Sequence, residues 1–483
     1  MPYDEAQPVT GTEQQQLYSK REAIHPQLVK GKYRVMKWIV LFVTLGVYYG
    51  LPWVRWPRAP QEPSQAVLVD FSGSRLYFFG IEIWPDEFYL VTGVLVLAAL
   101  SLFFVTAIWG RLWCGFTCPQ TVWTDLYIAV ERMIEGDRNK RLKLAKESWS
   151  ASKVAKKLSK HTLWLLIAMA TGGAWVLYFH DAPTVFAGLF EGTAPGTSYI
   201  FIGVLTFTTY SLAGLMREQV CTYMCPWPRI QGALIDADTF QVGYFHKRGE
   251  PRGKHKKGKD WSELGDCIDC QGCVVACPMG IDIRDGDQLE CINCGLCVDA
   301  CDSVMAKMGF PKGLIAYGTG YNDVATAEER QRLPRFIRPR TILYAAVLSV
   351  VSVVMLVGLF ARENVEFGIE RDRAVIATQL SDGRIRNAIT ARVLNKGSAA
   401  RDFSIEVAGP ETLTVSAVGL EVDEGRMTFS VDGDKQVKYR LFLTLPAEAT
   451  RQETIAITLT DRQSGERVER SIDFVRDQGG RRR

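Results

Sequence analysis

The sequence predicts a multi-domain membrane protein with five transmembrane α-helices, a cytoplasmic cysteine-rich insert and a C-terminal immunoglobulin-like β-sandwich. Three observations predict this fold class: five apolar stretches of membrane-spanning length, twelve cysteines confined to two connections, and alternating apolar and polar residues near the C-terminus. A chain of 483 residues has room for about three domains. Its 47% hydrophobic and 23% charged residues exclude a collagen-like, disordered or small disulfide-rich chain. The net charge of only +4 gives no reason to expect a nucleic-acid partner.

Five apolar stretches are long enough to cross a membrane as helices, because about 20 mostly apolar residues span the hydrocarbon core. They are residues 36–54, 88–109, 162–179, 199–216 and 341–360. A buried core helix would explain one such stretch but not five, so we expect all five to cross. The first is not a cleaved signal peptide, because the polar segment 1–35 precedes it.

Lysines and arginines predict the orientation of these spans, since short cytoplasmic loops are enriched in positive charge. The inner loop 110–161 carries eleven of them, whereas the loop 181–198 carries none. We therefore expect the N-terminus inside the cell and the C-terminus outside. All twelve cysteines then lie in cytoplasmic connections. A reducing cytoplasm keeps such thiols free for metal, so a disulfide framework is not expected.

Eight cysteines between residues 266 and 302 form two runs with the spacing C-x-x-C-x-x-C-x-x-x-C. This spacing is typical of bacterial two-cluster ferredoxins, in which the fourth cysteine of each run ligates the other cluster. We therefore expect a two-cluster ferredoxin-like insert with two 4Fe-4S clusters. The expected ligand sets are Cys267, Cys270, Cys273 and Cys301 for one cluster, and Cys291, Cys294, Cys297 and Cys277 for the other. Two zinc sites would instead show paired C-x-x-C units with a longer spacer.

Two local features of these runs concern the backbone. Gly272 and Gly295 lie between cysteines, where we expect glycine to let the chain bend tightly around sulfur. Asp302 follows the second run where the ferredoxin pattern has proline, which alters the local turn but removes no ligand.

A second pair of motifs has the form C-x-x-x-C-P. Cys114 and Cys118 follow the second span, and Cys221 and Cys225 follow the fourth. Each motif ends a helical hairpin, so the two form an internal repeat, and corresponding positions of such repeats converge near a shared site. We expect the four thiols to meet at the inner membrane surface, where they suit copper(I), a third iron-sulfur cluster or a redox dithiol. The alternative is that these small residues simply pack where helices crowd.

The prolines of these motifs carry a further expectation. Proline favours the first position of a helix, which would make Cys118 and Cys225 N-cap residues, where the pKa of a thiol falls. The helix that follows the first motif is expected to lie in the membrane interface with one apolar face, from Val122 to Met133.

The five histidines argue against a haem in the bilayer, because His161 and His180 flank the third span at opposite ends. His246 and His255 belong to a basic stretch that ends at residue 259. This stretch either docks an acidic electron donor or is a solvated linker near anionic lipid.

Within residues 361–483, the stretch from about 372 to 476 alternates apolar and polar side chains between turn signals such as Asp382-Gly383 and Asp432-Gly433. About seven short strands over about 100 residues indicate an immunoglobulin-like sandwich. The segment contains no cysteine, tryptophan or histidine, so we expect a docking or scaffolding role and no catalytic site there.

Together these features predict the following organisation: a cytoplasmic N-terminal segment 1–35, a four-helix membrane region 36–216 with an outer hairpin 55–87 and an inner loop 110–161, a cytoplasmic polyferredoxin insert 217–340, a fifth transmembrane helix 341–360 and a periplasmic domain 361–483.

Several segments resemble a known family. They are residues 18–21 (YSKR), 48–53 (YYGLPW), 113–123 (WCGFTCPQTVW) and 131–138 (ERMIEGDR), and they resemble the CcoG (FixG/RdxA) family of cytochrome c oxidase accessory proteins. The likeness runs from about residue 17 to the C-terminus, in the same order of spans, insert and sandwich. It implies a bacterial inner (cytoplasmic) membrane protein that reduces copper(II) to copper(I) for assembly of the cbb3-type oxidase. It also implies that the eight insert cysteines hold two 4Fe-4S clusters and that the other four are the family's membrane cysteine pairs.

The leading hypothesis is therefore a membrane cupric reductase, an oxidoreductase that passes electrons from a cytoplasmic donor through the clusters to copper at the interfacial cysteines. Its expected partners are the copper ion, that donor, the lipid membrane, and oxidase assembly factors or a copper transporter or chaperone. One alternative is an electron conduit between the quinone pool and a redox partner. Another is an oxidase-assembly scaffold whose clusters are structural. The chain contains no dinucleotide or flavin fingerprint that would identify the donor.

Overall fold

The computed structural model describes residues 23–58, 62–254, 263–319, 335–362, 364–371, 377–397, 399–423, 425–446 and 454–475. The chain divides into two compact units, residues 1–356 and 357–483, each with its own apolar core. The motif 18–21, residue His255 with the end of the basic stretch, and the C-terminal tail lie outside the described residues.

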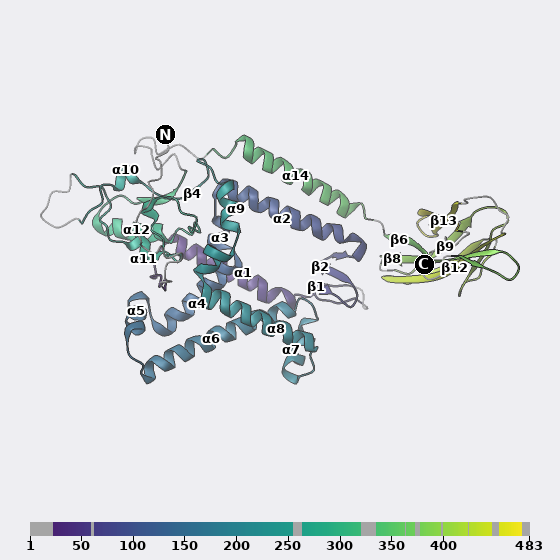
Figure 1. The fold of residues 1–483 in the computed structure, drawn as a ribbon, viewed down its shortest axis with the longest axis horizontal. Coiled ribbons are helices and arrows are strands. Elements are labelled where there is room, and N and C mark those ends of the chain that lie inside the picture. Colours follow the sequence, from purple (N-terminus) through teal and green to yellow (C-terminus); the bar gives the residue numbers. More distant parts are fainter. Residues whose placement is uncertain are drawn as a thin grey trace, which may run out of the picture. The chain divides into compact units, whose positions relative to one another are not determined.

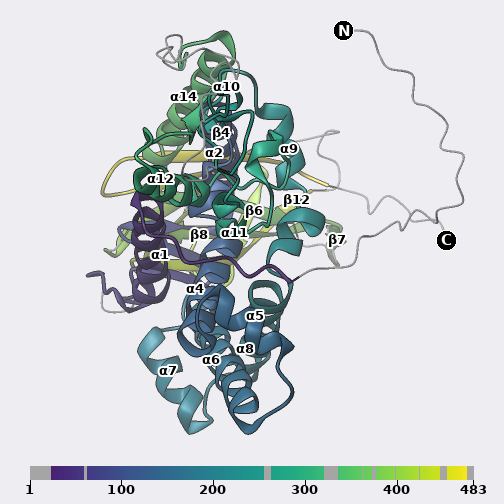
Figure 2. The ribbon, with the colours of Figure 1, turned by 90° about the vertical axis from the view of Figure 1, so that its left-hand side faces the viewer.

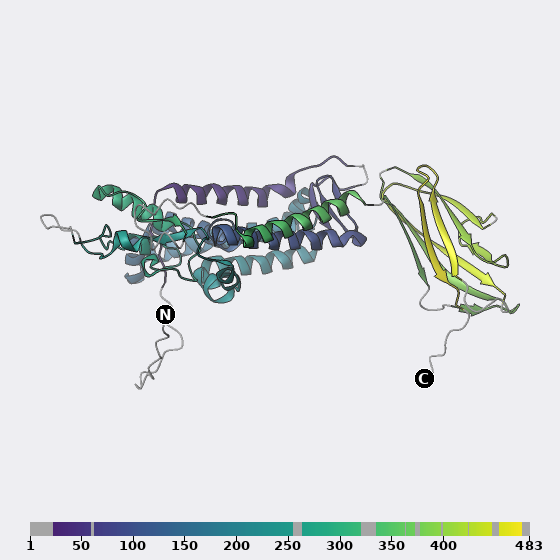
Figure 3. The same ribbon diagram turned by 90° about the horizontal axis from the view of Figure 1, so that it is seen from above.

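Four helical segments among the described residues are long and apolar enough to cross a membrane (Figures 1 and 3). Their bounds are Lys32–Trp53, Pro85–Trp109, Gly196–Met216 and Pro339–Phe360. The elements within them are α1 (Lys32–Gly50) and η1 (Leu51–Trp53), η2 (Pro85–Glu87) and α2 (Phe88–Trp109), α8 (Gly196–Thr209) and the π-helix η3 (Tyr210–Met216), and α14 (Pro339–Phe360). Most side chains of these segments face outward rather than into a core, as expected for surfaces covered by lipid.

The remaining expected span, residues 162–179, is not among these four candidates. It lies in α6 (Ala151–Val176), a helix of 26 residues. Four lysines lie within the first ten residues of this helix, and glycine, threonine and histidine stand among its apolar residues. By length and composition alone the structure therefore supports four spans and not the predicted five. The α6 helix packs along α8 and against α4 (Pro119–Glu135).

Two connections lie at one end of the long helices, one between η1 and η2 and the other between α6 and α8. An antiparallel sheet pairs β1 (Val67–Asp70) with β2 (Arg75–Phe78) and β2 with β3 (Ile81–Ile83). The helix α7 (Ala182–Glu191) follows α6. Its N-cap is Asp181, whose carboxylate accepts hydrogen bonds from Thr184. These elements occupy the segments predicted as outer loops.

The opposite end carries the cysteine-rich part of the chain (Figure 2). Its elements are α3 (Leu112–Phe116), α4, α5 (Arg138–Lys146), the π-helix η4 (Val220–Met224), α9 (Trp227–Leu234), β4 (Gln241–Tyr244), α10 (His246–Gly249), α11 (Gly272–Ala276), η5 (Ile283–Asp285), α12 (Leu296–Met308) and β5 (Ile315–Gly318). The strands β4 and β5 pair antiparallel, and α11 packs against α12. The single apolar face predicted for α4 is not observed, because its polar side chains Asp125, Glu131 and Glu135 are buried as well, whereas Met133 is exposed.

The second unit is an immunoglobulin-like β-sheet domain, with more strands than the predicted seven. One sheet has the strand order β10-β12-β8-β6 with β7 beside β8, and the other has the order β11-β9-β13-β14. The strands are β6 (Val365–Arg371), β7 (Ala377–Gln379), β8 (Ile385–Asn395), β9 (Arg401–Ala408), β10 (Thr414–Ala417), β11 (Arg426–Val431), β12 (Lys435–Leu445), β13 (Thr454–Asp461) and β14 (Arg467–Asp473). Alternate residues such as Phe403 and Ile405 point inward and form one buried core between the sheets.

Candidate metal centres

The four cysteines of the C-x-x-x-C-P motifs lie at the ends of two long helices. Cys114 belongs to α3, directly after α2, and Cys118 is the N-cap of α4, whose first residue is Pro119. Cys221 belongs to η4, which follows η3 after a short turn, and Cys225 ends this element. Proline at the first helical position thus makes Cys118 an N-cap as predicted. For Cys225 the prediction is wrong by one residue, because Pro226 is itself the N-cap of α9.

The fold brings these two pairs of thiols together from positions about a hundred residues apart in the sequence. Burial raises the pKa of the Cys114 thiol to about 12, with further contributions from Cys118, Cys221 and Cys225. Burial likewise raises the pKa of Cys221 to about 12, with contributions from Cys118 and Cys225. Cys114 and Cys221 also pack against the same buried apolar cluster, so the two motifs meet in one region of the fold; we call Cys114, Cys118, Cys221 and Cys225 the interfacial thiols.

The predicted lowering of the Cys118 pKa is wrong. Backbone N–H groups of Thr121 and Gln120 at the start of α4 do favour the thiolate, but burial outweighs them and the pKa of Cys118 is raised. The raised pKa values of Cys114, Cys118 and Cys221 favour the protonated thiol, so binding of a metal ion there would release protons.

A glutamine that sequence reasoning missed is the polar partner of this cluster. The Cys114 thiol donates to Oε1 of Gln231 over 3.3 Å, and Nε2 of Gln231 donates to Oγ1 of Thr106 over 3.3 Å. Gln231 is completely buried. No sequence signal marks it, since it lies in the short helix α9 outside both motifs.

The eight insert cysteines form two groups in space. The pKa of Cys301 is raised to about 12, mainly by burial and then by the nearby charges of Cys273, Cys270 and Cys267. Burial raises the pKa of Cys277 to about 12, with Cys294 and Cys291 adding to it. The pKa of Cys297 is also raised, by burial and by Cys294, Cys291 and Cys277. The fourth cysteine of each run therefore stands beside the first three of the other run.

The backbone around these thiols fits an iron-sulfur cluster. In the first run Asp269 and Gln271, on either side of Cys270, adopt φ of 52° and 55°. In the second run Asn293 and Gly295, on either side of Cys294, adopt φ of 57° and 71°. Alternation of left- and right-handed residues turns successive N–H groups toward one point and forms the concave nest found at many iron-sulfur sites. Gly295 thus bends as predicted, whereas in the first run Asp269 and Gln271, and not Gly272, carry the bend.

A cavity provides a second test of fit. Its walls are formed by thiols and apolar side chains, namely Cys273, Cys277, Cys291, Cys294, Cys297, Val242, Met279, Ile281, Ile283 and Ile292, together with Gly295. Soft sulfur donors around an apolar space match the chemistry of a cluster ligated by four thiolates.

The group formed by Cys277, Cys291, Cys294 and Cys297 adjoins the interfacial thiols. Cys114, Cys221 and Cys277 all pack against one buried apolar cluster that includes Ile292 and Cys294. In the other group Cys270 is exposed, whereas Cys267 and Cys273 are buried.

Arg111 and Asn293 fix the second cysteine loop to the end of α2. The Arg111 guanidinium donates to the carbonyl oxygens of Gln288 and Cys291 over 3.1 Å each, and also to Leu289. Nδ2 of Asn293 donates to the carbonyl oxygen of Trp109 over 3.2 Å. Oδ1 of Asn293 accepts from the backbone N–H of Val242 over 2.7 Å.

Asp299 joins the insert to α1. Its carboxylate accepts hydrogen bonds from the backbone N–H groups of Tyr33 (3.3 Å) and Arg34 (2.8 Å), in the first turn of that helix. These N–H groups have no partner within a helix, and a carboxylate there is also favoured by the helix dipole.

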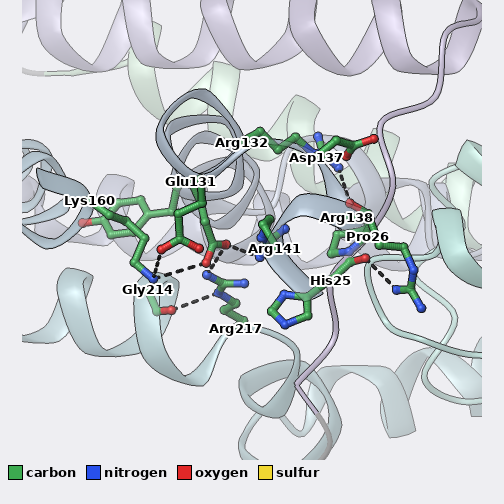
Figure 4. Close-up of polar contacts among 12 residues, drawn as sticks. His25, Pro26, Glu131, Arg132, Asp137, Arg138, Arg141, Lys160, Gly214 and Arg217 are labelled. Carbon is green, nitrogen blue, oxygen red and sulfur yellow. Dashed lines mark hydrogen bonds and ion pairs between the residues drawn. The ribbon is translucent and has the colours of Figure 1, made fainter. Parts of the chain in front are cut away.

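A buried ion-pair network joins α4, the helix that begins after Cys118, to Arg217, four residues before Cys221 (Figure 4). Glu131 of α4 pairs with Arg141, with Arg217 (2.7 Å) and with Lys160 (3.3 Å). Burial alone would raise the pKa of Glu131, but Arg217, Arg141 and Lys160 outweigh it and the pKa is lowered. The segment that carries His25 lies next to this network and is tied to α5, where the Arg138 guanidinium donates to the His25 carbonyl oxygen over 2.7 Å.

A second cavity, which we call the Cys221 cavity, lies between α4, the start of η4 and the insert. Its polar lining includes Lys37, Thr121, Asp125, Glu218 and Cys221. Apolar side chains, among them Ile128, Met279 and Ile292, form the rest of its lining, and it lies directly beside one of the interfacial thiols.

Comparison with known proteins yields three family matches. Residues 91–136 match a 4Fe-4S binding domain, residues 216–320 match a 4Fe-4S dicluster domain, and residues 355–477 match the IG-like fold at the C-terminal of FixG. The chain thus carries iron-sulfur binding domains in addition to its membrane-span candidates.

Full-length relatives place the chain in a family. It is 45% identical over 482 residues to the nitrogen fixation protein FixG of Rhizobium meliloti, which covers 93% of this chain and 92% of FixG. It is 47% identical over 474 residues to protein RdxB of Cereibacter sphaeroides, with 96% and 98% of the two chains covered. A crystal structure of a FixG-related protein from Vibrio parahaemolyticus aligns with 24% of this chain and 97% of its own, at 20% identity and a TM-score of 0.20. The chain belongs to the FixG/RdxA/RdxB family of membrane iron-sulfur proteins.

Proposed function

We propose that this protein is a membrane oxidoreductase that reduces copper(II) to copper(I) at the interfacial thiols, in support of cbb3-type oxidase assembly. One observation carries the proposal: Cys114 and Cys221 pack on the apolar cluster that also contacts Cys277 and contains Cys294. An acceptor held at the interfacial thiols would thus lie next to a site suited to an electron carrier.

The insert cysteines would hold two 4Fe-4S clusters, one on Cys267, Cys270, Cys273 and Cys301 and the other on Cys277, Cys291, Cys294 and Cys297. Bound there, the clusters supply one-electron transfer. Residues of the protein itself provide access for the electron donor and fix the distance between the two sites. Exposed Cys270 marks the side open to a cytoplasmic electron donor. Arg111 and Asn293 hold the second loop against α2 and so fix its distance from the interfacial thiols.

The interfacial thiols suit copper as substrate. Thiolates are soft ligands that favour copper(I), so the product of reduction is the form that they bind better. One electron leaves the donor and one arrives on the copper ion, and no covalent bond is made or broken in the protein.

A second candidate function is electron transfer to the quinone pool through a third cluster at the interfacial thiols. The match of residues 91–136, which include Cys114 and Cys118, to a 4Fe-4S binding domain favours it.

We further propose that α6 is the fifth span in a bacterial inner membrane. The interfacial thiols come from the ends of both α2 and η3, so these two ends lie on the same side of the membrane. Two helices that run in the same direction require a crossing between them, and α6 is the long helix in that interval. Positive charge then places the N-terminus and the insert in the cytoplasm and residues 361–483 in the periplasm. Periplasmic reporter fusions should be active after residue 192 and inactive after residue 148.

The partners remain expectations from the family resemblance. They are a cytoplasmic electron donor, the lipid membrane, and an oxidase assembly factor, copper transporter or chaperone that receives copper(I). No nucleic acid is expected.

The deciding experiment uses the purified full-length protein without oxygen. It is reduced, mixed with an equimolar amount of copper(II), and followed by cluster absorbance and by a chelator that colours with copper(I). The comparison variant changes Cys114, Cys118, Cys221 and Cys225 to serine and must retain the absorbance of the insert.

Fast copper-dependent reoxidation in the parent and its loss in the variant are the expected results. Equal rates in both proteins would mean that copper merely oxidises exposed clusters, and would overturn the proposal. Iron analysis separates the second candidate, because a third cluster would add four iron atoms per chain that the variant lacks.

A further inference from the structure

The two halves of the internal repeat share an unusual backbone hinge. Gly110, between α2 and α3, has φ 56° and ψ −125°. Arg217, between η3 and η4, has φ 47° and ψ −113°. Each hinge stands four residues before the first cysteine of its motif. The same turn therefore delivers both cysteine pairs to the shared site.

Only the first copy uses the residue that this turn favours. Glycine adopts positive φ without strain, whereas a side chain at such a position is strained and persists only when its surroundings hold it. Arg217 also lies between two π-helical segments, η3 and η4. Segments of this kind are rare and frequently occur at functional sites. The second hinge thus keeps arginine at a position where glycine would be easier.

The surroundings of Arg217 hold it at four points. Its backbone N–H donates to the carbonyl oxygen of Leu212 over 2.8 Å, and its own carbonyl oxygen accepts from Nε2 of Gln120 over 3.1 Å. Its Nε donates to the carbonyl oxygen of Gly214 over 2.9 Å. Its Nη2 donates to Oε2 of Glu131 over 2.7 Å, a bond drawn in Figure 4. The two side-chain bonds are available to arginine and not to glycine.

The side chains that bond to Arg217 show which two parts of the fold it connects. Gln120 and Glu131 both belong to α4, the helix that begins at Cys118. Glu131 is itself held by Arg141 and Lys160 and is only 3% exposed, so it is a firm anchor. Bonds from α4 to Arg217 therefore link the helix of the first cysteine pair to the turn that presents the second pair.

We propose that Arg217 is a positioning residue that holds the Cys221–Cys225 loop against the Cys114–Cys118 pair through Glu131, so that the four thiols can bind one metal ion. The claim about the position of the loop stands on its own geometry, and the claim about the metal rests on the proposed function. Residues that orient metal ligands without touching the metal commonly contribute about 10- to 100-fold to metal affinity.

Arg217→Gly tests this role, because it removes the side-chain bonds and at the same time relieves the backbone. Two measurements are made on the full chain in detergent without oxygen. One is the affinity for copper(I), by competition with a coloured chelator. The other is the alkylation rate of each thiol, assigned by mass spectrometry. We expect copper(I) affinity to fall by about 10- to 100-fold. We also expect faster alkylation of Cys221 and Cys225, with unchanged absorbance of the insert clusters.

Two further variants keep the test decisive. Arg217→Lys retains the charge but cannot make both side-chain bonds, so it should show an intermediate loss and serves if the glycine variant fails to accumulate. Lys157→Ala is the matched control, because Lys157 pairs with Glu135 of the same network over 2.8 Å and is one-third exposed. It should leave both measurements at the parental value.

The outcomes separate the two claims. If Arg217→Gly and Arg217→Lys both match the parent in alkylation and in copper(I) affinity, Arg217 does not position the loop. If alkylation of Cys221 and Cys225 rises but the parent itself binds no copper(I) at these thiols, the positioning role stands and the proposed function fails. If Lys157→Ala has the same effect as Arg217→Gly, the network acts only by general stability and the inference is overturned.

Discussion

Gly115 lies so close to Ile292 that a Cβ atom added to the glycine would stand 2.6 Å from the Ile292 carbonyl oxygen. Gly115 follows Cys114, and Ile292 lies between two cysteines of the insert. The backbones of the first C-x-x-x-C-P motif and the second ferredoxin run therefore approach each other closely at these two residues. Glycine permits this close approach because it places no side chain between the two backbone segments.

Gly115→Ala should separate these two loops. Backbone atoms stand opposite the added methyl group, so the neighbour cannot simply rotate away, and overpacking of this kind costs about 1–3 kcal/mol. We expect a lower thermal unfolding midpoint and slower copper-dependent reoxidation of the clusters. Gly173→Ala is the control, since nothing lies within 4 Å of its added Cβ and alanine favours the helix. A parental midpoint and rate for Gly115→Ala would show that the close approach has no role.

Asp299→Ala should loosen the junction between the insert and α1. It removes the acceptor for the N–H groups of Tyr33 and Arg34, and loss of such a helix-terminal partner costs about 0.5–2 kcal/mol. Thermal unfolding and limited proteolysis near residue 31 would measure the effect. Asp299→Asn retains an acceptor oxygen and should recover most of the stability. Equal losses in the two variants would instead assign the effect to charge.

Two substitutions of Asn293 separate its backbone role from its side-chain role. Asn293→Ala loses the bonds to Trp109 and Val242 and places alanine at a φ of 57°. Asn293→Gly loses the same bonds without the strain. We therefore expect alanine to be the less stable variant by about 1 kcal/mol, from thermal unfolding with intact cluster absorbance. The prediction is contradicted if glycine is equal to or worse than alanine.

Acid should weaken the attachment of the segment around His25. Burial, followed by the charge of Arg141, lowers the pKa of His25 from 6.5 to about 4. In the unfolded segment His25 binds a proton near pH 6.5, whereas in the folded segment it does so only near pH 4. The burial of neutral His25 therefore stabilises the folded segment fully above pH 6.5, and this stabilisation is lost as the pH falls toward 4.

Proteolytic cleavage near residue 25, measured between pH 7 and pH 5, tests this expectation. Above pH 5 most carboxylates remain ionised, so the histidine dominates the change. Cleavage of the parent should increase as the pH falls, whereas His25→Gln should show a flat profile. His180→Gln, in the loop at the other end of α6, is the control and should behave as the parent. A parental profile in His25→Gln would disprove the assignment.

Local patterns carried most of what could be predicted. The spacing of the insert cysteines predicts a two-cluster ferredoxin-like segment because one tight loop must supply three ligands, a constraint confined to a few residues. Alternation predicts the β-sandwich for the same reason, since side-chain direction in a strand is a property of neighbouring residues. The predicted span at 162–179 is not among the four candidate spans, because α6 combines lysines, glycines and apolar residues. Its proposed crossing depends on the location of two helix ends that are far apart in the sequence.

What the sequence by itself determined is the set of parts: apolar helices, two cysteine runs, a duplicated C-x-x-x-C-P motif and a sandwich domain. Only the tertiary structure decided that Cys277 and Cys294 adjoin Cys114 and Cys221, that Gln231 bonds to Cys114, and that Arg217 occupies the place of a glycine. Each of these relationships joins residues far apart in the chain. Their positions depend on how whole helices and loops pack, and no local propensity or spacing encodes that packing.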